Sequence, residues 1–349
     1  MPLNIIRGDL SKIQAEALVN PANSQLMGGG GVSGALFRAA GWEKMQAACD
    51  AIGHCAPGQA VVTPAFALPA RYVIHTVGPV YQGGRPREAR LLWQAYVNSL
   101  NLAKKMKLGS IAFPLISSGT YGYPQAEALD IAIRSIRGWL DDQKEEPKVT
   151  LVLFHRLHLP EESLLLRRIA QQVAQSKHLE EPIRYSERDH AQAALEAAVE
   201  GGEEAPQRLR DYSRYYHEAP MPQAKDHRTL GERILELDEG FSTTLLRLID
   251  ERGMTDTQVY KRANIDRKHF SKIRSNPHYA PTKATVLQLA IALGLNHQEA
   301  SDLLARAGFA FSPAHKMDVV IGYCLKEGIH NIDRINTLLL QFDLATLGV

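Results

Sequence analysis

The sequence predicts a layered α/β domain followed by a linker and a second, small all-α domain. In the first half of the chain, short β-branched segments alternate with segments of helical periodicity, which is typical of an α/β domain with a mostly parallel sheet. From residue 241 onwards only helical periods occur. Because 349 residues exceed what one core usually holds, we expect three parts with boundaries at 1–176, 177–240 and 241–349.

Five segments of the first part have the composition of buried strands. They are Ala17–Asn20, Gln59–Thr63, Tyr72–Thr76, Ser110–Pro114 and Val149–Phe154. Three segments between them have helical periodicity, and they are Gly34–Ala40, Glu88–Met106 and Gln125–Leu140. The run Leu151–Phe154 is apolar at every position, as expected for a strand that helices cover on both faces.

The amino-acid composition changes after about residue 161. A helix at 162–176, with Ile169 and Val173 on its apolar side, is expected to pack back on the first part. The rest of this zone is rich in Ala, Glu, Gln and Arg and is interrupted by Pro and Gly. It is the only net acidic zone of the chain. We expect a polar, partly ordered linker.

Composition excludes several classes of protein. The chain has 40 Lys and Arg against 38 Asp and Glu, so its net charge of +2 indicates neither a nucleic acid nor a membrane surface as partner. Cys49, Cys55 and Cys324 form no Cys-x-x-Cys pair, which argues against a disulfide framework and against a structural metal site. No apolar run approaches the ~18–20 residues of a membrane span. We expect a soluble, cytoplasmic protein without a metal or cofactor.

Two glycine loops are the strongest chemical signals. Gly28–Gly34 follows the strand that ends near Asn20 and precedes a helix, so its backbone N–H groups can approach an anion next to the positive end of the helix dipole. Ile116–Pro124 follows the strand Ser110–Pro114 in the same way. Because ligands of open α/β sheets bind at the carboxyl ends of the strands, the two loops are expected to clamp a diphosphate together.

These motifs resemble those of the macrodomain family in order and spacing. The matching segments are Gly8–Leu10, Asn20–Asn23, Gly28–Gly34, His75–Pro79 and Ile116–Pro124. The resemblance covers about Leu3–Ser176 and implies a three-layer α/β/α sandwich with a mixed, mainly parallel sheet. It also implies a module that binds ADP-ribose, free or attached to a protein.

The resemblance implies a role for each motif. Asp9 would accept hydrogen bonds from the adenine amino group, while the Leu10 backbone would hold the ring. Phe154 would stack on the ring, with core packing as the alternative. Asn23 would bind the distal ribose, and Tyr121 would close over it. The phosphates would be wrapped by the amides of Gly29, Gly30, Gly31, Val32, Ser33, Ser117, Ser118, Gly119, Thr120 and Tyr121. His75 is expected to be structural.

Whether the chain turns over its ligand is left open by the sequence. The hydrolase branch of the family carries Asp where this chain has Ser33, and Ala where it has Pro21. A serine hydroxyl is no general base without a partner. Asn23 and Ser33 are the catalytic candidates. The alternatives are a reader that binds ADP-ribose or a related NAD-derived nucleotide, and an ADP-ribosyl or O-acetyl-ADP-ribose hydrolase.

The helical part resembles the helix-turn-helix repressor family between Phe241 and about Asn296. Met254–Ala263 would be the first helix of the motif, Asn264-Ile265 the turn and Asp266–Ser275 the recognition helix, with Asp266 as N-cap. Asn264 is a residue that tolerates the left-handed conformation of such a turn. The candidate DNA contacts are Arg267, Lys268, Lys272 and Arg274.

Two interpretations of this helical part stay open. In the first, it binds duplex DNA, which makes the chain a regulator that responds to NAD-derived signals. In the second, it docks a partner protein or forms a homodimer, with 309–347 as the interface.

Overall fold

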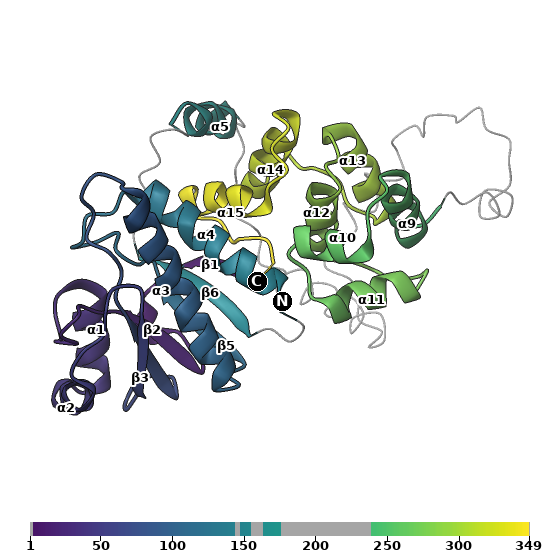
Figure 1. Ribbon diagram of the computed structural model, residues 1–349. Coiled ribbons are helices and arrows are strands. Elements are labelled where there is room, and N and C mark those ends of the chain that lie inside the picture. Colours follow the sequence, from purple (N-terminus) through teal and green to yellow (C-terminus); the bar gives the residue numbers. More distant parts are fainter. Residues whose placement is uncertain (1–2, 144–146, 155–162, 176–238, 349) are drawn as a thin grey trace, which may run out of the picture. The chain divides into compact units, whose positions relative to one another are not determined.

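The computed structural model describes residues 3–143, 147–154, 163–175 and 239–348 (Figure 1). The described residues up to 175 and from 240 onwards belong to one compact unit. The predicted linker, 177–240, lies outside the described residues except for its last two. The boundaries between the three parts therefore stay a prediction.

The sheet has six strands in the order β1-β6-β5-β2-β4-β3. They are β1 (Leu3–Arg7), β2 (Ala17–Pro21), β3 (Ala60–Pro64), β4 (Tyr72–Thr76), β5 (Ser110–Pro114) and β6 (Lys148–Leu153). All neighbours are parallel except β3, which pairs with β4 in antiparallel fashion. The prediction of a mixed, mainly parallel sheet is confirmed.

Helices cover both faces of this sheet. The elements of the first part are η1 (Leu10–Lys12), α1 (Gly31–Ala40), α2 (Trp42–Ile52), α3 (Pro86–Lys105) and α4 (Gln125–Asp141). Within β2, Ala17 and Val19 pack with residues of α3 and α4, whereas Leu18 packs with residues of α1 and α2. Because neighbouring strand residues face opposite sides, this alternation defines three layers, as predicted.

Three features of the first part differ from the sequence prediction. The strand β1 and the helix α2 were not among the predicted elements. The helix α1 begins at Gly31 rather than at Gly34, because the last residues of the glycine loop form its first turn. β1 is short and contains the polar residues Asn4 and Arg7, so its sequence lacks the continuous apolar pattern of a buried strand.

The sequence predicted that the helix at 162–176 packs on the α/β part. For α5 (Ser163–Gln175) this prediction is wrong. Its Ile169 is fully buried in the core of the helical part, and Leu166 and Val173 pack against the same core. The main contacts of α5 are with α14 (Lys316–Lys326). An amphipathic pattern fixes which side of a helix is buried, but not which surface covers it.

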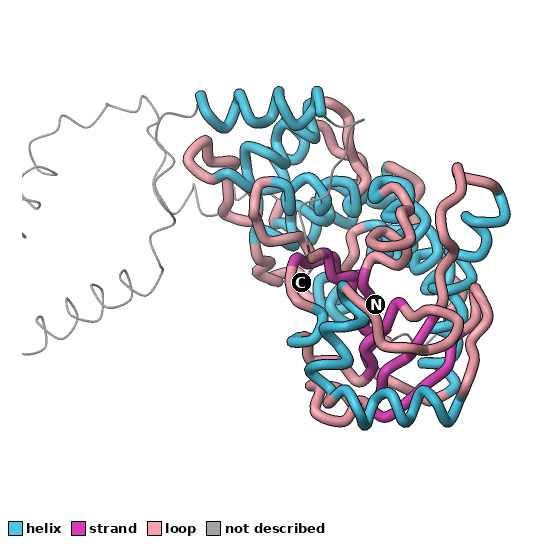
Figure 2. Tube along the Cα trace, turned by 90° about the vertical axis from the view of Figure 1, so that its left-hand side faces the viewer, coloured by secondary structure: helices cyan, strands magenta, loops and turns pink. Residues whose placement is uncertain are grey.

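The C-terminal part is all-helical among its described residues, as predicted, and Figure 2 shows the strands confined to one sheet. Its other helices are α9 (Phe241–Glu251), α10 (Asp256–Arg262), α11 (Arg267–Ser275), α12 (Lys283–Ala292), α13 (His297–Arg306) and α15 (Ile332–Gln341). Side chains cap several of them, including the predicted N-cap Asp266, which accepts from the Lys268 N–H. The centre of this core is α12, which is buried from Thr285 to Ala292.

His75 on β4 belongs to a buried polar cluster. Its Nδ1 lies 3.0 Å from Asn20 Nδ2, and its Nε2 lies 2.8 Å from Thr63 Oγ1. Burial lowers the pKa of His75 to about 4, so the ring is neutral at pH 7. Asn20 then donates to Nδ1, and Nε2–H donates to Thr63. The expectation that His75 is structural is confirmed.

We predict that His75 makes the fold acid-sensitive. Between pH 6.5 and 4 the unfolded chain binds a proton at this ring and the folded chain does not, so the free energy of unfolding falls as the pH falls. The loss is about 1.4 kcal/mol per pH unit across this window. Urea unfolding of wild type and His75→Gln at several pH values measures it. Parallel pH dependences for the two proteins would contradict this role.

Candidate functional site

A cavity of about 540 Å³ lies at the carboxyl edge of the sheet. Residues that directly follow four strands line it: Gly8–Leu10 after β1, Ala22 and Asn23 after β2, Leu115–Tyr121 after β5 and Phe154 after β6. The start of α1 completes the lining. Every ligand-binding residue that the sequence predicted therefore lines the same cavity.

The first glycine loop presents main-chain N–H groups at the start of α1. No side chain caps this helix, whose N-cap is Gly30. Among the described residues, the amides from Gly29 to Ser33 donate to no acceptor, and the first helical bond is from the Gly34 N–H to the Gly30 carbonyl. The end of a helix that leaves its N–H groups unpaired favours an anion.

The second glycine loop, which follows β5, also presents main-chain N–H groups. Its shape is fixed by bonds from the Tyr123 N–H to the Ser117 carbonyl (3.0 Å) and from the Gly122 N–H to the Gly119 carbonyl (2.8 Å). The amides of the four residues Ser118–Tyr121 find no acceptor in the described chain. The cavity therefore has two separate sets of N–H groups that an anionic ligand can satisfy.

Ser117 is the most constrained residue of this loop. Its backbone adopts φ +65°, which is rare for a residue with a side chain. Its hydroxyl is buried and has no hydrogen-bond partner among the described residues. The hydroxyl lies so close to Gly78 that a Cβ at position 78 would overlap it. Strain and an unsatisfied polar group together are features of functional sites.

Glycine is not required by the fold at three positions that line the cavity. A Cβ built on Gly29, Gly30 or Gly119 meets no atom within 4 Å, and none of the three has a positive φ. Gly34 contrasts with them, because its Cβ would overlap the Gly29 carbonyl oxygen. The three open glycines leave space in front of the amides, as a ligand that approaches the backbone requires.

Asp9 lines the cavity after β1, which is separated from β5 and β2 by β6 in the sheet. Its Oδ1 accepts from the Ser11 hydroxyl (2.7 Å) and from the Ser11 N–H (3.0 Å). The hydroxyl bond is the largest cause that lowers the pKa of Asp9, so the carboxylate is ionised at neutral pH. Only Oδ1 is used in these bonds, and Oδ2 lies 3.8 Å from the Lys12 ammonium. Asp9 thus retains acceptor capacity for a ligand.

The position of the Phe154 side chain distinguishes its two predicted roles, stacking on the adenine ring and packing in the core. Its side chain is 60% exposed and lines the cavity, so the interpretation as a core residue is wrong. An exposed aromatic ring at the edge of a cavity is suited to stack on a planar ligand. Tyr121 lies in the opposite loop and is half-buried, and burial raises the pKa of its hydroxyl, which is therefore protonated at neutral pH.

Asn23 is largely engaged with its own loop. Its Oδ1 accepts from the N–H groups of Gln25 and Met27, both at 3.1 Å, and its Nδ2 donates to the Met27 carbonyl at 2.8 Å. One amide hydrogen remains for a ligand. The side chain therefore shapes the entry to the glycine loop as well as lining the cavity.

Ser33 and Arg38 distinguish the α1 side of the cavity. Ser33 is buried in the first turn of α1 and lines the cavity, where the related hydrolases were expected to carry Asp. Arg38 also lines the cavity and is exposed, yet the sequence analysis did not include it. Arg38 lies one helical turn after Gly34 on α1, and this spacing could have identified it as a residue of the cavity. Asp9 is the only carboxylate among the described residues that line the cavity.

The DNA-binding candidates lie together on α11. Arg267, Lys268 and Lys272 are exposed and have no acidic partner in the described part of the chain. Arg274 forms an ion pair with Asp256, which neutralises one of the predicted contacts. Residues 263–266 connect α10 to α11, and Asn264 adopts the left-handed conformation expected of it, with φ +56°.

The described residues contain no group of three or more His, Cys, Asp or Glu side chains arranged to hold a metal ion. None of the helices in the described ranges is long and apolar enough to cross a membrane.

Comparisons with known proteins agree with this architecture. The sequence profile described as Macro domain matches residues 19–132. A macro domain-containing protein of Ralstonia nicotianae is 53% identical over 135 residues, which are 39% of this chain and 78% of that protein. An O-acetyl-ADP-ribose deacetylase of Citrobacter rodentium is 47% identical over 156 residues, which are 44% of this chain and 88% of that protein.

One solved structure is that of a mutant of the Oceanobacillus iheyensis macrodomain with ADPR. It is 40% identical, with a TM-score of 0.42, and the match covers 44% of this chain and 85% of that one.

The fold and the cavity define an α/β protein whose main-chain amides line a pocket at the carboxyl edge of a mixed sheet. On the match to its relatives, the chain belongs to the macrodomain family. The helical part lies outside the matched region.

Proposed function

We propose that the cavity binds ADP-ribose, free or attached to a protein. The observation that carries the proposal is the pair of amide sets, Gly29–Ser33 and Ser118–Tyr121, which open into one cavity without acceptors among the described residues. A diphosphate between them would accept from both sets. Charge-assisted bonds from N–H groups to an anion are roughly twice as strong as neutral ones.

The two ends of the cavity fit the two ends of this nucleotide. Asp9 supplies a carboxylate acceptor for the adenine amino group, and Phe154 supplies an exposed ring to stack on the base. Asn23 and Tyr121 would lie at the distal ribose, and Arg38 adds a positive charge beside the phosphates. Membership of the macrodomain family supports the same ligand class, and one relative is named for an ADP-ribose ester.

The glycines that have space for a Cβ provide a test of the proposed phosphate position. Gly30→Ala and Gly119→Ala place a methyl group where a phosphate would contact the amides, and each is expected to weaken ADP-ribose binding about 10- to 100-fold. Thermal unfolding should be nearly unchanged, because a Cβ meets no atom at either position. Calorimetric titration of the full chain measures the affinities.

Gly138→Ala is the matched control, because Gly138 also has space for a Cβ but lies on the exposed side of α4, away from the cavity. Equal affinities for all three variants and wild type would contradict the proposed phosphate position.

Hydrolysis of the bound nucleotide is the second candidate activity. The name of the Citrobacter rodentium relative, an O-acetyl-ADP-ribose deacetylase, favours it. Against rapid turnover, Ser33 stands where a carboxylate would activate water, and Asp9 lies at the adenine end. We therefore propose that the cavity mainly binds its ligand, as a reader, and cleaves an ester slowly.

Ser33→Asp tests this assignment. If a missing general base limits the reaction, the variant should hydrolyse O-acetyl-ADP-ribose about 10²–10⁴-fold faster than wild type. Chromatographic assay of acetate release gives the rates, with Ser33→Asn as a control for the change of side-chain size. A wild type that is already faster than Ser33→Asp would show that turnover does not depend on a carboxylate at this position.

We also propose that α11 contacts duplex DNA, which would make the chain a regulator that responds to NAD-derived nucleotides. The exposed, unpaired cations Arg267, Lys268 and Lys272 on one short helix favour DNA over a protein partner or a second copy of the chain.

Lys272→Ala should weaken DNA binding. It should also reduce, by about one, the steepness with which the logarithm of the observed binding constant falls with the logarithm of the salt concentration. Lys316→Ala, which removes a cation from the start of α14, is the control. Fluorescence anisotropy with a mixed-sequence duplex measures both. No binding to any duplex at low salt would rule out this role.

A further inference from the structure

The strand β1 lies at one edge of the sheet, so half of its main-chain groups point away from its only strand partner, β6. In a parallel pair, alternate residues share one orientation. Leu3 and Ile5 are alternate residues of β1, and both are fully buried. Their outward N–H and C=O groups need partners from elsewhere in the chain, because buried main-chain groups are rarely left unpaired.

Asn264 supplies both partners of Leu3. The Leu3 N–H donates to Asn264 Oδ1 at 2.9 Å, and Asn264 Nδ2 donates to the Leu3 carbonyl at 3.0 Å. One side-chain amide thus takes the place that a neighbouring strand would occupy. The two residues are 261 positions apart, and Asn264 is only 2% exposed.

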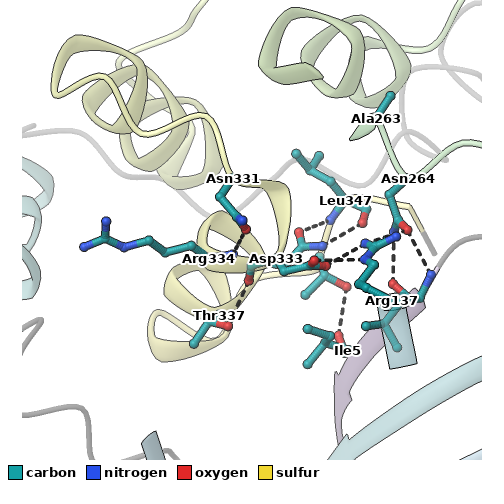
Figure 3. Close-up of polar contacts among 12 residues, drawn as sticks. Ile5, Arg137, Ala263, Asn264, Asn331, Asp333, Arg334, Thr337 and Leu347 are labelled. Atoms are coloured by element: carbon teal, nitrogen blue, oxygen red, sulfur yellow. Dashed lines mark hydrogen bonds and ion pairs between the residues drawn. The ribbon is translucent and has the colours of Figure 1, made fainter. Parts of the chain in front are cut away.

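Arg137 and Asp333 hold the Asn264 side chain in place. Arg137, on α4, donates from Nη2 to Asn264 Oδ1 at 3.0 Å. The same guanidinium forms two bonds to Asp333, on α15, at 2.7 and 3.0 Å. Figure 3 shows the three side chains directed toward one another. A bidentate pair of this kind fixes direction as well as distance.

The far end of the chain binds a further outward group of β1, the Ile5 carbonyl. Thr346 Oγ1 donates to the Ile5 carbonyl at 3.1 Å, and Asp343 forms an ion pair with Arg7 (Figure 3 shows Ile5). Asn336 holds this C-terminal segment through Leu347, with bonds to both main-chain groups at 2.7 and 2.9 Å. Three outward main-chain groups of β1, both of Leu3 and the carbonyl of Ile5, are therefore bound by residues of the helical part.

The other end of β1 leads directly into the cavity. The Gly8 N–H donates to the Leu153 carbonyl at 3.0 Å and continues the pairing with β6. Asp9 and Leu10 follow and line the cavity at its adenine end. Four strand residues and Gly8 separate Leu3, which Asn264 holds, from Asp9 at the start of the segment that would hold adenine.

We infer that Asn264 is a positioning residue for the nucleotide cavity. Through Leu3 it fixes β1, and β1 fixes Asp9 and Leu10, so the helical part completes the cavity without contacting the ligand. This inference rests on the proposed binding of ADP-ribose. Asn264 also forms the turn between α10 and α11, so occupancy of the cavity and the state of α11 are linked, and linkage acts equally in both directions.

Calorimetric titration of the full chain with ADP-ribose tests the inference. Asn264→Gly keeps a residue suited to φ +56° but removes both bonds to Leu3, and it should raise Kd roughly five- to tenfold. Asn264→Asp keeps the acceptor for the Leu3 N–H but places a charged oxygen against the Leu3 carbonyl, so its Kd should also exceed that of wild type. Thr282→Ala removes the side-chain cap of α12 and should leave Kd unchanged.

Hydrogen exchange in the free protein gives a readout that does not need the ligand. The Gly8 amide should exchange faster in Asn264→Gly and at the wild-type rate in Thr282→Ala. An unchanged Kd in Asn264→Gly, or the same change in Thr282→Ala, would overturn the inference. If wild type binds no ADP-ribose, the proposed function fails, and the exchange rate of Gly8 still decides whether Asn264 positions β1.

Discussion

Main-chain N–H groups without acceptors are the constraint on which the site depends. The sheet brings the ends of β2 and β5 next to each other, and each end is followed by a loop that turns its amides toward one cavity. These donors have no acceptor within the described chain, and several of their residues, such as Gly30 and Gly119, are exposed, so water can bind them. An anion with several acceptor oxygens would replace that water with charge-assisted hydrogen bonds. The proposed affinity for a diphosphate would thus arise from backbone geometry and depend little on charged side chains.

The helical part contributes to the same site from outside the cavity. A strand at the edge of a sheet exposes hydrogen-bonding groups that invite non-native pairing. Here Asn264 and Thr346 bind those groups on β1, so the edge is protected and the strand is held at a fixed position. The family model matches residues 19–132, which belong to the α/β part. This edge contact therefore relates the nucleotide cavity to a region that the family model does not match.

The cavity could be predicted from the sequence because its lining is contributed by short contiguous segments. Gly28–Gly34 and Ile116–Pro124 can be recognised locally, from their glycine content and their position after a strand. β1 could not be predicted in this way, since its burial depends on residues more than 250 positions away. The surface against which α5 packs could not be predicted for the same reason, because the periodicity of a helix does not identify a distant partner. The engagement of Asn23 with its own loop likewise depends on a turn that composition does not specify.

NMR spectra of the amide groups, recorded while ADP-ribose is added to the full chain, show whether both loops contact the ligand. If they do, signals from both loops, at 29–33 and at 118–121, should move together and saturate at one ligand concentration, with large shifts in both sets. Signals of exposed glycines outside the cavity, such as Gly138, should stay in place. Shifts confined to one loop, or no shift in either at millimolar ligand, would contradict the proposed contact.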